Sequence, residues 1–102
     1  ELMTKLSMSL RIATNHPALA GHFPGDPVVP GTMILDAVLE AVLSMLPGHR
    51  LASVRQAKFL LPLRPGQDAK IEVDKQGGLI RFRCFRSADI IALGEISVIA
   101  GD

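Results

Sequence analysis

Residues 21–46, GHFPGDPVVPGTMILDAVLEAVLSML, decide the fold of this chain. The first eleven of them are rich in Gly and Pro, which predicts an ordered loop in place of a helix or strand. From Thr32 to Leu46 the sequence is apolar almost all the way round a helix, so we expect a helix that is buried on most sides. Gly31 or Thr32 can cap its start, and the dipeptide at 47–48, Pro-Gly, ends it.

The predicted helix carries one polar stripe. Its four polar residues are spaced by four and drift slowly around one face: Thr32, Asp36, Glu40 and Ser44. The stripe must face solvent, a subunit interface or a polar cavity. With His22 in the preceding loop, Asp36 makes a titratable pair where solvation is poor, and such a pair is typical of acid–base chemistry.

The rest of the chain has the period of strands. Apolar and polar residues alternate over residues 5–13, 57–63, 69–74 and 80–84, and residues 90–99 form a final apolar strand. Residues 76–78 and 87–89 are suited to hairpin turns. One helix among five strands predicts an α+β fold, in which an antiparallel sheet wraps the helix.

The amino-acid composition favours some classes of protein and argues against others. The 102 residues are 48% hydrophobic, which is more apolar surface than one small domain over residues 1–102 can bury, so we expect an oligomer. The net charge is +1, and Trp and Tyr are absent, which argues against a nucleic-acid platform. The lone Cys84 fits a reducing, cytoplasmic compartment, and no stretch is long and apolar enough to span a membrane. Because the chain begins at Glu1 and not at Met, the sequence leaves open whether a leader or domain precedes it.

Two segments carry a family resemblance. The motif at residues 21–31, with an acid fourteen residues after its histidine, resembles the 3-hydroxyacyl-[acyl-carrier-protein] dehydratases of the FabA/FabZ type. The segment at 57–67, AKFLLPLRPGQ, resembles a second signature of that family, a strand that ends in a Pro-Gly turn. The resemblance implies a hotdog fold, in which a curved antiparallel sheet of about five strands wraps one long central helix.

The resemblance also implies residue roles. His22 matches the catalytic histidine, Asp36 the catalytic acid, and Gly31 the glycine whose N–H polarises the thioester carbonyl. Phe23 and Pro30 are placed near the acyl tunnel. In this family the histidine and the acid of one site come from different subunits, which implies a homodimer or higher homo-oligomer. The substrate is implied to be carried by an acyl carrier protein, with no cofactor and no metal.

The implied reaction removes water from a (3R)-3-hydroxyacyl thioester to give a trans-2-enoyl thioester, in fatty-acid or related lipid or polyketide synthesis. A neutral imidazole can take the alpha proton near pH 7. A carboxyl group can protonate the leaving hydroxyl only if it stays protonated, so burial must raise its pKa. The helix N-terminus supplies an N–H and partial positive charge for the carbonyl oxygen.

Several alternatives stay open. A hotdog acyl thioesterase and a non-catalytic acyl-binding module would share the fold. Glu40 stands where the family commonly has Gln, either as a solvated residue or as part of the site. Without the longer N-terminal helical segment of the common fatty-acid enzymes, the sequence resembles compact dehydratases. The identity of the acyl chain in the substrate therefore stays open. Arg81, Arg83 and Arg86 form either a basic patch for an acidic carrier protein or, as we favour, a solvated strand face.

Overall fold

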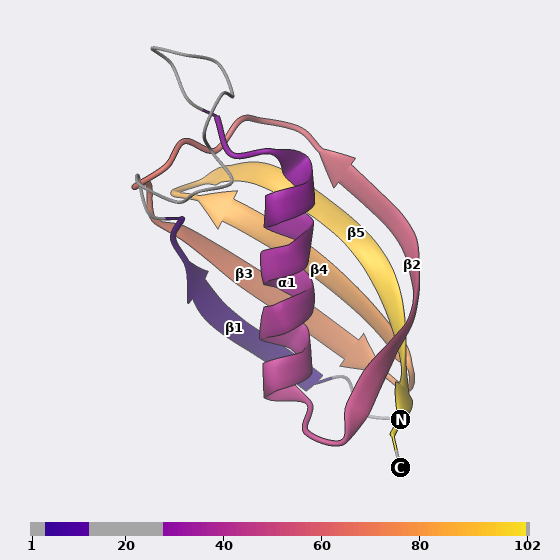
Figure 1. Ribbon diagram of the computed structural model, residues 1–102. Coiled ribbons are helices and arrows are strands. Elements are labelled where there is room, and N and C mark those ends of the chain that lie inside the picture. Colours follow the sequence, from indigo (N-terminus) through magenta and orange to yellow (C-terminus); the bar gives the residue numbers. More distant parts are fainter. Residues whose placement is uncertain (1–3, 13–27, 102) are drawn as a thin grey trace.

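The computed structural model describes residues 4–12 and 28–101. Within these residues the elements are β1 (Thr4–Leu10), α1 (Gly31–Met45), β2 (His49–Phe59), β3 (Ala69–Gln76), β4 (Leu79–Arg86) and β5 (Asp89–Ala100). The strands form one antiparallel sheet in the order β1-β3-β4-β5-β2, and α1 lies across one face of this curved sheet (Figure 1). The predicted α+β hotdog architecture is therefore confirmed.

Strict alternation builds the two central hairpins. On β3 and β4 the buried side chains alternate with exposed or half-buried ones, so each strand has one apolar face toward α1. The predicted hairpin turns lie where the sequence places them: Gly77 has a φ of 61° between β3 and β4, and Ser87 a φ of 54° between β4 and β5. A left-handed residue in each two-residue turn matches the twist of the strands that it joins.

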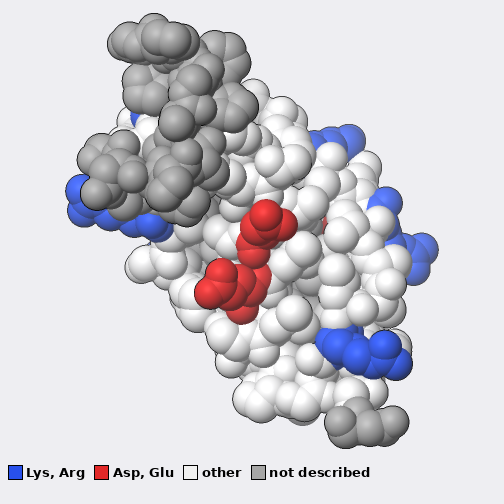
Figure 2. All heavy atoms as spheres, in the orientation of Figure 1, with Lys and Arg blue, Asp and Glu red and all other residues white. Residues whose placement is uncertain are grey.

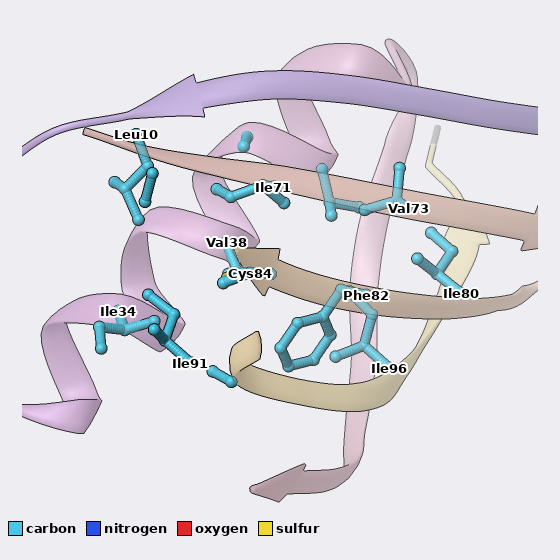
Figure 3. Close-up of a cluster of buried hydrophobic side chains, with 14 of the residues drawn as sticks. Leu10, Ile34, Val38, Ile71, Val73, Ile80, Phe82, Cys84, Ile91 and Ile96 are labelled. Carbon is cyan, nitrogen blue, oxygen red and sulfur yellow. The ribbon is translucent and has the colours of Figure 1, made fainter. Parts of the chain in front are cut away.

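The core lies between α1 and the inner face of the sheet. Figure 3 shows side chains from α1, β1, β3, β4 and β5 meeting there, and among the largest that are fully buried are Ile71, Ile80, Phe82, Ile91 and Ile96. Cys84 is buried in the same cluster, as expected for a small core residue. None of the polar or charged residues among those described is fully buried, so the core is held by apolar packing alone.

Helix α1 differs from the prediction in two respects. Its N-cap is Pro30, and no side chain makes a capping hydrogen bond, so Thr32 is not a cap. Only one side of the helix is buried within the chain, and the polar stripe is exposed. The buried side chains are those of Ile34, Val38, Ala41 and Val42. Within the described parts of the chain, no helix has the length and apolar character needed to cross a membrane.

Strand β2 also differs, at both ends. It begins at His49, eight residues before the predicted strand. Two bulges interrupt its register with β5, one between Leu51 and Ser53 and one between Val54 and Gln56. Each bulge adds a residue and breaks the period of two that sequence analysis relies on. The strand ends at Phe59, and the predicted continuation through Leu63 leaves the sheet.

Candidate functional site at the start of the helix

The first turn of α1 offers backbone donors. The Pro30 carbonyl oxygen accepts hydrogen bonds from the N–H groups of Met33 (3.0 Å) and Ile34 (3.3 Å). For the N–H groups of Gly31 and Thr32, no partner is found among the described residues. The first N–H groups of a helix point away from it and carry partial positive charge, so these two can bind an oxygen atom of a ligand.

An apolar hollow opens beside this turn, and we call it the helix-start groove. Its volume is about 350 Å³, and it is lined by Val28–Gly31, Ile34 and Phe59–Pro62. The lining comes from two segments, one leading into α1 and the other leaving β2. No side chain of this lining is charged, so the groove suits an apolar chain that ends in a group able to accept a hydrogen bond.

Backbone hydrogen bonds hold the two segments together. The Val29 N–H donates to the Leu63 carbonyl over 2.7 Å, and the Leu60 N–H donates to the Ile91 carbonyl of β5 over 2.8 Å. Val29 and Leu63 are both buried, with 3% and 0% of their surface exposed. The walls of the groove are therefore anchored to the sheet and to each other.

Part of this lining was not singled out by the sequence pattern. Phe59, Leu60 and Leu61 are exposed by 47%, 52% and 42%, although alternation assigned them to a half-buried strand. Three large apolar residues in a row before a proline break that alternation, and this was the available signal for a surface that meets a ligand or partner. Pro30 and Gly31, which the resemblance places in the site, do line the groove.

Asp36 does not line the helix-start groove. Five residues separate it from Gly31, which is about 7.5 Å along the axis and about 140° around it. Its side chain is exposed, so the burial expected for a catalytic acid is not provided by this chain alone. His22 and Phe23 lie outside the described residues, so their positions relative to Asp36 stay predictions.

Glu40 lies one turn beyond Asp36 on the same exposed stripe. With Ser44 it lines a second hollow of about 260 Å³ between α1 and β1, next to Met8 and Arg11. No ion pair joins Asp36 or Glu40 to another described residue. Figure 2 shows acidic side chains gathered over α1 in a largely uncharged surface, with basic side chains toward the β2 edge.

The outer face of the sheet is different in character. A hollow of about 590 Å³ there is lined by charged and polar side chains including Asp68, Lys70 and Glu72. We place the site in the smaller helix-start groove, because it combines an apolar lining with N–H groups that have no partner among the described residues.

The three arginines considered as a basic patch all have acidic neighbours. Arg81 lies 3.1 Å from Glu95, Arg83 3.6 Å from Asp74, and Arg86 3.8 Å from Asp89. These pairs neutralise much of the positive charge, which favours the interpretation as a solvated strand face.

Neither a reactive thiol nor a metal centre is found in the described parts of the chain. Burial raises the pKa of the Cys84 thiol to about 12, so the nucleophilic thiolate is disfavoured at neutral pH. No group of three His, Cys, Asp or Glu residues among those described could hold a metal ion.

Comparisons with known proteins show the family to which the chain is similar. Residues 2–95 match the model of the ApeI-like family, described as ApeI dehydratase. A 3-hydroxyacyl-[acyl-carrier-protein] dehydratase FabZ of Bartonella quintana is 34% identical over 101 residues, which cover 87% of this chain and 65% of that protein. The chain thus spans just under two thirds of that relative's length.

Solved structures show the same fold. The dehydratase heterocomplex ApeI:P from Xenorhabdus doucetiae matches with a TM-score of 0.80 and 26% identity, over 92% of this chain and 86% of that one. An acyl-CoA hydrolase mutant from Staphylococcus aureus matches with a TM-score of 0.72 over 96% of this chain and 67% of that one, but at 17% identity. The second likeness concerns the fold alone.

Proposed function

Because the chain belongs to the ApeI-like dehydratase family, we propose that it removes water from a (3R)-3-hydroxyacyl thioester to give a trans-2-enoyl thioester. His22 is the base and Asp36, from a second subunit, is the acid. The Gly31 N–H binds the thioester carbonyl oxygen, and Phe23 and Pro30 contact the acyl chain. The Gly31 N–H, which has no partner among the described residues, lies beside an apolar groove, and this observation carries the proposal.

Each residue type fits one part of the elimination. The imidazole of His22 takes the proton from the carbon next to the carbonyl, and that C–H electron pair becomes the new double bond. As the bond between the beta carbon and its hydroxyl breaks, the Asp36 carboxyl gives its proton to the departing oxygen, which leaves as water. The Gly31 N–H stabilises the negative charge that develops on the carbonyl oxygen.

The position of Asp36 supports a site shared between two chains. Asp36 is exposed on the side of α1 away from the helix-start groove of its own chain, so it can serve the groove of another. A second subunit that covers the stripe would also remove the Asp36 carboxyl from water, which is what a protonated acid requires.

Strand β2 is the edge that we propose meets the second chain. It lies at the end of the sheet order, and among the described strands it pairs with β5 alone, so its other side offers backbone groups that no described strand pairs with. Val54 is 40% exposed and pairs in register with the buried Ile96, which places both on the inner face. Exposed apolar side chains at a free edge are typical of an interface.

The carrier, the partner and the compartment are proposed on other observations. An acyl carrier protein is proposed because the curated relatives are named for it. A homodimer or higher homo-oligomer is proposed first, and a heteromer is the second candidate because the solved Xenorhabdus doucetiae relative is a heterocomplex. The cytoplasm is proposed because the single Cys84 is compatible with a reducing compartment.

Turnover of a crotonyl or longer enoyl thioester, linked to carrier protein or coenzyme A, tests the reaction by loss of the enoyl absorbance on hydration. We expect His22→Ala and Asp36→Ala each to lower kcat by roughly 100-fold or more. When the two variants are mixed and allowed to exchange subunits, half of the dimers carry one intact site. The mixture should therefore recover about a quarter of wild-type activity if the site is shared in a two-fold homodimer.

The other outcomes decide against parts of the proposal. Activity that survives both substitutions would overturn the residue assignment. Release of free thiol without loss of the double bond would identify a thioesterase, and bound acyl groups without turnover would identify a binding module. An inactive monomer that gains activity only with a second hotdog protein would identify the heteromer.

A further inference from the structure

We propose that Phe59 is a positioning residue: its ring holds the first residue of α1 so that the Gly31 N–H faces the helix-start groove. This inference rests on the proposed function, because it assigns the ring's effect to the N–H that binds the thioester carbonyl. Phe59 comes from β2, 28 residues after Gly31 in the chain, and it is not part of the loop and helix motif.

The ring lies directly against Gly31. A Cβ atom placed on Gly31 would lie 3.1 Å from the Cδ2 and Cε2 atoms of Phe59 and 3.2 Å from its Cγ. Ordinary contacts of a Cβ atom fall between 3.4 and 4 Å, so a side chain at residue 31 would push the ring or the helix aside.

The requirement for glycine is one of space. The glycines with positive φ among the described residues are Gly48, Gly66 and Gly77, and Gly31 is not one of them. Its backbone conformation would therefore accept other residues. What excludes them is the aromatic ring, so residues 31 and 59 form one steric unit.

The ring itself is held by the sheet. Phe59 pairs with Ala92 as the last residue of β2, and the next N–H, that of Leu60, donates to the Ile91 carbonyl over 2.8 Å. About half of the Phe59 side chain stays exposed and forms a wall of the groove. The Phe59 ring is therefore fixed by β2 and β5, and it contacts the first residue of α1.

A second anchor acts on the other side of Gly31. Two residues before it, the Val29 N–H donates to the Leu63 carbonyl over 2.7 Å. With the chain fixed at Val29 and the ring pressed on Gly31, the N–H has little room to move. A donor must lie about 2.7–3.1 Å from the oxygen that it stabilises, and a displacement of about 1 Å can cost roughly 100-fold in rate.

A double-mutant cycle between Gly31→Ala and Phe59→Leu tests this coupling through kcat, KM and the thermal midpoint. We expect Phe59→Leu to lower kcat about tenfold with KM within about threefold, because the N–H is less well placed. Gly31→Ala should lower kcat by about 100-fold in the wild-type background but by less than about threefold in Phe59→Leu, where the shorter side chain makes room.

Two further variants separate positioning from packing. Phe59→Tyr keeps the ring and can point its hydroxyl to solvent, so its kcat should stay within about twofold of wild type. Phe85→Leu makes the same change as Phe59→Leu on the outer face and should leave kcat unchanged. If Phe59→Leu fails to fold, Phe59→Met, whose side chain is longer and more flexible, replaces it in the cycle.

The cycle and the proposed function fail in different ways. If the wild type turns over no thioester, the proposed function is wrong, and additive shifts of the thermal midpoint would then also refute the Gly31–Phe59 coupling. If the wild type is active, an equal loss of kcat from Gly31→Ala in both backgrounds overturns the positioning role. So does a Phe59→Leu variant that changes KM alone.

Discussion

The two faces of the sheet differ in how their surface charges are paired. On the outer face, register aligns five residues in one row across the five strands: Lys5, Asp74, Arg81, Glu95 and Gln56. The first four carry charges that alternate in sign, and Gln56 is neutral. On the face that carries α1, carboxylates without described partners lie beside exposed apolar side chains. The outer charges are paired within one chain, whereas we propose that the inner face meets a ligand or a second chain.

The largest contrast between the faces should appear in activity. Asp36→Asn removes the proposed acid and should lower kcat by roughly 100-fold or more, because the amide has no acidic proton to give to the leaving hydroxyl. Asp74→Asn makes the same change on the outer face and should stay within about twofold of wild type. Steady-state turnover measures both, and comparable activity of the two variants would contradict the assignment of the site to the inner face.

A second contrast concerns association. Val54→Asp puts a charge on the inner face of the β2 edge and should weaken self-association at least about tenfold, because the charge loses its hydration in an interface. Ile99→Asp, at a residue of similar exposure on β5, is the control and should leave association unchanged. Sedimentation across protein concentration gives both constants, and equal weakening by the two variants would exclude β2 as the interface.

Burial in the core between α1 and the sheet predicts a pH effect at Cys84. Burial raises the pKa of this thiol from 9.0 to about 12, so the neutral thiol stabilises the folded state below pH 9. That contribution is lost as the pH rises from 9 toward 12. Alkylation at pH 8 should be at least about tenfold slower in the folded protein than in urea, as mass spectrometry can follow. Equal rates would show that water reaches the core.

The smallest effect is expected from the outer charges. A double-mutant cycle between Arg81→Ala and Glu95→Ala should give a coupling of about 0.2–1 kcal/mol in unfolding free energy, because the pair is exposed and screened by solvent. Activity should not change in either variant. Denaturant unfolding at low and high salt measures the coupling, and a loss of turnover would mean that this face also takes part in function.

Local pattern predicted most of the elements. The helix and the strands that became β1, β3, β4 and β5 follow from apolar periodicity, because each repeats one residue environment along a regular backbone. The start of β2 did not follow, since its two bulges remove the period of two. The end of β2 was misplaced because Leu60 and Leu61 are apolar and yet exposed.

The sequence by itself determined the family motif, the glycine that begins α1 and the polar stripe that carries Asp36. Only the tertiary structure decided that the Phe59 ring lies on Gly31, that Asp36 does not line the groove, and that the outer charges neutralise one another. The reason is physical. Periodicity and turn chemistry act between near neighbours in the chain, whereas these contacts join residues that meet only after the sheet has paired and the helix has packed against it.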